Sequence, residues 1–170
     1  MQWIKDNKRQ IASALFWILT FVWMIFIFCM SAKNATQSSE LSCNVIEKAA
    51  PVINKNFHQL DEKGKKDFIE SLQDVVRTFA HFFEFTLLGG LGFGAFRFTL
   101  NCRKKGVIWS VVMGCIYALT DEIHQIFVPG RTFQLKDILV DCSGILLGTA
   151  LAFILCKFIE WIRTKKTLSK

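Results

Sequence analysis

Four apolar runs, each about as long as a membrane-spanning helix, constrain the fold of this chain more than any other feature. They cover residues 11–30, 78–100, 107–127 and 138–161. Because a helix needs about 20 mainly apolar residues to cross the hydrocarbon core of a bilayer, each run predicts one transmembrane span. The 52% hydrophobic content and the 17 Phe agree with exposure to lipid. We therefore expect an all-α, polytopic membrane protein with a single domain over residues 1–170.

The first run is expected to remain as a span, because a signal peptide has a shorter apolar core. Residues 31–76, which follow it, are polar and mixed in charge. Apolar residues recur at helical spacing within 41–53 and again within 68–76. We expect two short amphipathic helices here, resting on the membrane surface or on the bundle; the alternative is a solvated loop with fragments of helix. Cys29 and Cys43 could pair outside the membrane.

Basic residues concentrate on one side of the predicted membrane. The two termini, the segment between the second and third runs, and the adjoining ends of the runs hold twelve Lys or Arg against two Asp or Glu. Since short basic segments stay in the cytoplasm, both termini are predicted to be cytoplasmic and residues 31–76 extracytoplasmic. This distribution accounts for the net charge of +7. We therefore expect the lipid bilayer as a partner, and no nucleic acid.

Ionisable and polar side chains gather where three of the runs reach the predicted outer face. They are Arg77, His81 and Glu84 in and before the second run; Asp121, Glu122, His124, Gln125 and Arg131 at the end of the third; and Asp137 and Asp141 at the start of the fourth. The spacing i, i+3 or i+4 places members of each group on one helix face. Such groups are costly in lipid and normally face a bundle interior or water. We infer one polar site that opens outward.

The same residues form a spaced pattern across the last three runs. It reads Arg77-x3-His81-x2-Glu84, then Asp121-Glu122-x-His124-Gln125-x-Phe127-x-Pro129-Gly130-Arg131, then Asp137-x3-Asp141-x2-Gly144-x3-Gly148. This pattern resembles that of the VanZ-like family. The resemblance implies a small protein of the bacterial cell membrane, in a family associated with low-level resistance to the glycopeptide teicoplanin. It implies no particular reaction. We accordingly expect a protein of the cell envelope that lowers susceptibility to glycopeptide antibiotics.

A first hypothesis for the site is recognition or modification of a lipid-linked envelope component, such as a cell-wall precursor, at the outer leaflet. Arg77 and Arg131 would bind a phosphate or carboxylate through paired hydrogen bonds. His81 or His124 would act as a general base, held by a carboxylate on the same helix. The candidate catalytic residues are Asp121, Glu122 and His124, and the candidate binding residues are Arg77, His81, Glu84, Gln125, Arg131, Asp137 and Asp141.

A second hypothesis is a divalent metal site, which would make the protein a metal-dependent membrane hydrolase. Its ligands would be His81, Glu84 and His124, together with one of Asp121, Asp137 or Asp141. These residue types suit zinc or another divalent ion. The structural alternative is that the arginines and carboxylates are ion pairs that lock the bundle.

A third hypothesis is a non-catalytic binding protein or a small transporter. No nucleophile stands out in the pattern, which favours binding or general acid–base hydrolysis over covalent catalysis. Four spans leave little room for a conduction path, so transport would require an oligomer. The small residues Gly144 and Gly148 lie on one helix face and suit a close helix contact, which makes a homodimer an option.

Overall fold

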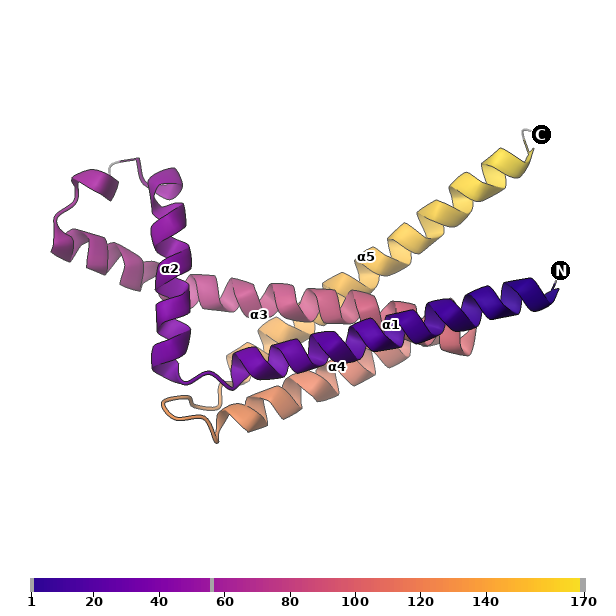
Figure 1. Ribbon diagram of the computed structural model, residues 1–170, viewed down its shortest axis with the longest axis horizontal. Coiled ribbons are helices and arrows are strands. Elements are labelled where there is room, and N and C mark those ends of the chain that lie inside the picture. Colours follow the sequence, from indigo (N-terminus) through magenta and orange to yellow (C-terminus); the bar gives the residue numbers. More distant parts are fainter. Residues whose placement is uncertain (1, 56, 169–170) are drawn as a thin grey trace.

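The computed structural model describes residues 2–55 and 57–168, and the regular structure in these residues is entirely helical. The elements are α1 (Gln2–Ser31), α2 (Ala35–Ile53), the short 3-10 helix η1 (Phe57–Gln59), α3 (Glu62–Leu100), α4 (Arg103–Gln125) and α5 (Leu135–Leu168) (Figure 1). Four of them, α1, α3, α4 and α5, are long and apolar enough to cross a membrane. The predicted all-α membrane architecture is confirmed.

Helix α3 is the centre of the bundle, since it packs against α1, α4 and α5. A small core joins the four helices and consists of Ile27, Phe85, Leu88, Ala118 and Ile145. Many other large apolar side chains on α1, α4 and α5 are exposed. A soluble monomer rarely exposes such extensive apolar surface, so these side chains are the lipid-facing exterior of a multi-pass membrane protein.

The tightest contact in the bundle joins α3 to α5 through glycines. A Cβ atom at Gly148 would collide with the backbone carbonyl of Thr86, and one at Gly144 would collide with the carbonyl of Phe82. Small residues allow two helix backbones to approach this closely. The Gly144/Gly148 face is therefore covered by α3 of the same chain, and the motif provides no surface for a homodimer.

The region of residues 31–76 contains one separate amphipathic helix, α2, rather than two. The second amphipathic segment is the first part of α3, which runs for 39 residues, or about 58 Å. It begins where the Asp61 carboxylate accepts a hydrogen bond from the Gly64 amide at 2.8 Å, and no Gly or Pro interrupts residues 65–88. This first part extends past the bundle and packs against α2, which crosses the end of the bundle (Figure 1).

Both described chain ends lie at the opposite end of the bundle from α2 (Figure 1), as an even number of spans requires. At that end the Glu160 carboxylate pairs with two arginines. It accepts a hydrogen bond from Arg97 at 2.8 Å and one from Arg103 at 2.7 Å. These ion pairs connect α5 to α3 and α4.

All six cysteines are free in the structure. The Sγ atom of Cys43 accepts a hydrogen bond from the Gln73 side-chain amide at 2.8 Å, which connects α2 to α3. The disulfide considered between Cys29 and Cys43 is therefore not formed.

Candidate functional site

The polar residues singled out in the sequence converge at the end of the bundle that carries α2. The site is formed by the middle of α3, the last turn of α4 and the first turns of α5. The buried members are Asp121, Glu122, Gln125, Arg131 and Asp141, and the half-buried ones are Arg77, His81, Glu84, His124 and Asp137. The tertiary structure thus gathers ten side chains from three helices and one loop.

The loop after α4 returns the chain to the site. Helix α4 ends at Gln125, and the amides of residues 126–128 then donate to carbonyls three residues earlier, which tightens the chain. The helix therefore ends before it reaches Pro129. Gly130 adopts the left-handed conformation, with φ of 77°, which a side chain would disfavour. This turn directs Arg131 back into the protein, where it is 8% exposed.

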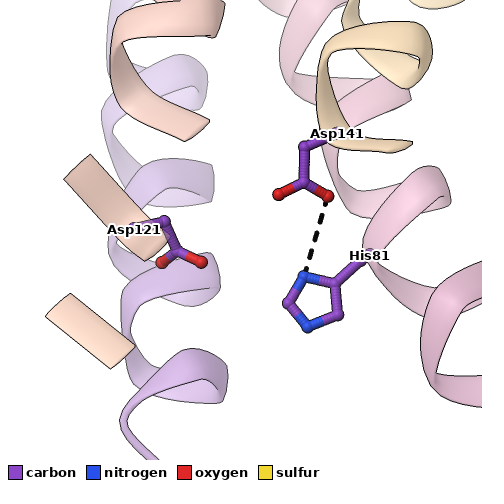
Figure 2. Close-up of side chains that lie close together, drawn as sticks. All are labelled: His81, Asp121 and Asp141. Atoms are coloured by element: carbon purple, nitrogen blue, oxygen red, sulfur yellow. Dashed lines mark ion pairs between the residues drawn. The ribbon is translucent and has the colours of Figure 1, made fainter. Parts of the chain in front are cut away.

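Three of the side chains, one from each helix, point into a common space. They are His81 of α3, Asp121 of α4 and Asp141 of α5 (Figure 2). One ligand atom from each lies within 4.8 Å of the other two. Asp121 is 3% exposed and Asp141 1% exposed. The Nδ1 atom of His81 is 3.8 Å from Oδ1 of Asp141, which is too long for a hydrogen bond.

Neighbouring side chains hold the Asp121 carboxylate by one oxygen only. Its Oδ2 atom accepts a hydrogen bond from the Ser31 hydroxyl at 2.8 Å and one from the Gln125 amide at 3.2 Å. Its Oδ1 atom has no hydrogen-bond partner. Ser31 is a site residue that the sequence analysis missed. It directly follows an apolar run and resembles an ordinary end of a span, and only the packing of α1 against α4 reveals its role.

Two of the candidate catalytic residues lie outside this group of three. Glu122 accepts a hydrogen bond from the backbone amide of Gln134 at 2.5 Å, so it connects the end of α4 to the loop before α5. His124 stacks on the Phe28 ring of α1, with ring centroids 4.4 Å apart. Within residues 2–55 and 57–168, the one cluster with the geometry of metal ligands includes neither Glu84 nor His124.

The two arginines of the site, Arg77 and Arg131, form no ion pair with a carboxylate in the described part of the chain. Two donors of the Arg131 guanidinium, Nε and Nη1, are buried without a hydrogen-bond acceptor. Burial, and next the nearby positive charge of Arg77, lower the pKa of Arg131 below its ordinary value. The geometry is therefore unlike that of an ion pair that locks the bundle.

Two cavities adjoin the site and share Arg77 and His81. The first, of about 120 Å³, is polar, and its other lining residues include Asp74, Gln134, Lys136 and Asp137. The second, of about 210 Å³, lies between α2 and α3 and reaches Arg131. Its remaining wall is mainly apolar and includes Met30, Leu41, Val45, Val76 and Ala80. Polar and apolar compartments thus meet at two side chains of α3.

Comparison with known proteins gives one result. The family model described as VanZ/LLP1 matches residues 16–156. Searches of curated proteins and of solved structures returned no match. The matched residues include α4, most of the spans of α1 and α5, all of α3, and every residue of the site. Because the match extends over most of the chain, this protein belongs to the VanZ/LLP1 family.

Proposed function

We propose that this membrane protein binds an anionic, lipid-linked component of the cell envelope at the outer leaflet and thereby lowers susceptibility to glycopeptide antibiotics. The observation that carries the proposal is the buried guanidinium of Arg131, which has two donors without acceptors and borders a cavity. A buried donor without a partner is costly. A phosphate or carboxylate would satisfy these donors by paired, charge-assisted hydrogen bonds.

The shape of the two cavities supports an amphiphilic ligand. Arg77 lines both cavities and Arg131 lines the apolar one, so an anionic headgroup where the cavities meet would lie beside both arginines, and the apolar α2–α3 wall would cover a hydrocarbon chain. Both volumes are below the roughly 300 Å³ at which pockets for drug-sized molecules begin. They suit a headgroup and part of a chain, and they are too small to enclose a glycopeptide antibiotic. This favours the lipid-linked component as the ligand.

The distribution of charge supports the outer leaflet as the place of binding. The site lies at the end of the bundle that carries α2, opposite the basic end with the termini (Figure 1). Short basic segments stay in the cytoplasm, so the site would open to the outside. The connection to glycopeptides rests on the resemblance to the VanZ-like family.

Binding is tested in nanodiscs by native mass spectrometry, with undecaprenyl phosphate as the probe and undecaprenol as the uncharged comparison. We expect the wild type to retain the phosphate and to release undecaprenol, and Arg131→Met to release both. Arg103→Met, at the other end of the bundle, should behave as wild type. Equal retention of both lipids by the wild type would contradict an anion site.

The phenotype is tested separately, by expression in a teicoplanin-susceptible Gram-positive host. We expect the wild type and Arg103→Met to raise the minimal inhibitory concentration of teicoplanin, and Arg131→Met to leave it at the level of the empty vector. Protein levels in the membrane fraction must be equal for the three. A rise that persists in Arg131→Met would separate the phenotype from this site.

A further inference from the structure

The space between His81, Asp121 and Asp141 contains three potential ligand atoms without hydrogen-bond partners. The Nδ1 atom of His81 and the Oδ1 atoms of Asp121 and Asp141 are buried and make no hydrogen bond. In the described part of the chain, no Lys or Arg forms an ion pair with either carboxylate. Two buried, ionised carboxylates that face one space are unfavourable unless a proton or a metal cation lies between them.

The spacing of these atoms is close to that of ligands on a single ion. Two ligand atoms about 2.1 Å from a tetrahedral metal are about 3.4 Å apart. The observed separation of Nδ1 of His81 from Oδ1 of Asp141 is 3.8 Å, and the three ligand atoms lie within 4.8 Å of one another. Small rotations of the side chains would therefore bring all three atoms to coordination distance from one ion.

The surroundings of Asp121 match those of a metal ligand. Ser31 and Gln125 both donate hydrogen bonds to its Oδ2 atom, which leaves Oδ1 available to an ion. Hydrogen bonds of this kind orient ligating carboxylates in metal sites and raise metal affinity. This Oδ1 atom is buried and has no hydrogen-bond partner.

We propose that His81, Asp121 and Asp141 bind one divalent transition-metal ion at the junction of the two cavities. One imidazole and two carboxylates suit Zn²⁺ or Mn²⁺, whereas Mg²⁺ and Ca²⁺ prefer all-oxygen ligands and Cu⁺ prefers sulfur. The two carboxylate charges balance the charge of the ion. This ligand set differs from the one expected from sequence, because it uses neither Glu84 nor His124.

Three protein ligands leave a coordination position open. In zinc enzymes such a position holds water or substrate. His81 lines both cavities, so the open position would be available to an oxygen of a bound phosphate. This last step depends on the proposed function, but binding of the metal does not.

The test measures metal directly, in protein purified in detergent and stripped of lipid. The protein is first treated with chelator, then dialysed separately against Zn²⁺ and Mn²⁺, and the bound metal is counted by mass spectrometry. We expect one ion per wild-type chain. Asp141→Asn, which preserves the size of the side chain, and His81→Ala should each weaken binding by more than about tenfold, the smallest loss typical of a disturbed metal site.

Two control variants make the result specific. His124→Phe retains a ring to stack on Phe28 and should bind metal as the wild type does; loss of metal in this variant would overturn the ligand set. Glu160→Gln, a carboxyl change at the other end of the bundle, should have no effect. Absence of stoichiometric metal in the wild type, or full retention in Asp141→Asn, would overturn the proposal.

A measurement on the wild type alone covers the case in which the variants fail to fold. X-ray absorption at the metal edge should show imidazole and oxygen scattering without sulfur, and a sulfur shell would place the ion at cysteines instead. The lipid and metal experiments are independent, because one uses lipid-free protein and the other follows lipid. Failure of one leaves the other interpretable.

Discussion

Replacement of Arg131 by methionine should make the ligand-free protein more stable. Arg131 is 8% exposed, has two buried donors without acceptors and has no ion pair in the described part of the chain. A buried donor without a partner costs about 1–3 kcal/mol, so removal of both should stabilise the folded state by about 2–6 kcal/mol. Methionine fills a similar volume without polar atoms. For a chain of this size, 1 kcal/mol shifts the melting temperature by about 2–4 °C, which predicts a rise of at least about 4 °C.

The assay is thermal unfolding in a lipid-free detergent, followed by the fluorescence of the five Trp. The matched control is Arg103→Met, which removes a half-exposed ion pair of 2.7 Å with Glu160. Such a pair contributes about 0–1 kcal/mol, so the control should melt at, or slightly below, the temperature of the wild type. A lower melting temperature for Arg131→Met would show that this guanidinium has structural partners, and it would refute the reasoning.

The same experiment with ligand reverses the order of stabilities. A ligand at 100 times its Kd stabilises the folded state by about 2.7 kcal/mol. Addition of undecaprenyl phosphate should therefore raise the melting temperature of the wild type and leave that of Arg131→Met unchanged. A residue that destabilises the empty protein and stabilises the complex is characteristic of a binding site rather than of a structural ion pair.

Three further predictions concern packing, orientation and the metal. Gly148→Ala places a Cβ against the backbone of α3 and should cost about 1–3 kcal/mol, whereas Gly90→Ala, whose nearest contact would be 3.5 Å, should be nearly neutral; equal stabilities would refute the close approach of the helices. Backbone hydrogen bonds, first that of Lys105, lower the pKa of the Cys102 thiol, so it should react quickly with a maleimide. Two variants with a single cysteine each, one at Lys63→Cys and one at the native Cys102, are treated in whole cells with a membrane-impermeant maleimide. The reagent should label Lys63→Cys in intact cells and Cys102 only after lysis; the reverse result would invert the predicted orientation. Ser31→Ala should weaken metal binding about 10–100-fold in a calorimetric titration, and an unchanged affinity would show that this hydroxyl does not orient Asp121.

Much of the architecture is readable from residue order alone. Four apolar runs of spanning length predict four membrane helices because backbone groups in lipid must bond within their own helix. The location of the polar site also follows, since side chains at i, i+3 and i+4 share a face and each group stands near the same end of its span. The ends of the helices were harder to predict from the sequence. Helix α3 begins at Glu62 rather than near residue 78, because helical propensity does not stop where hydrophobicity does.

The composition of the site depends on the packing of the helices. Local spacing places Asp121 and His124 on one helix face. In the structure, however, His124 stacks on Phe28 of α1, whereas Asp121 lies near His81 of α3 and Asp141 of α5. Ser31 joins the site from a helix whose sequence shows no polar pattern. Likewise, Gly144 and Gly148 indicate a close helix contact, but only the bundle shows that α3 is the partner. Spacing along a helix determines which side chains share a face, whereas the partner of that face is decided by the relative rotation of the helices, which arises from contacts far apart in the chain.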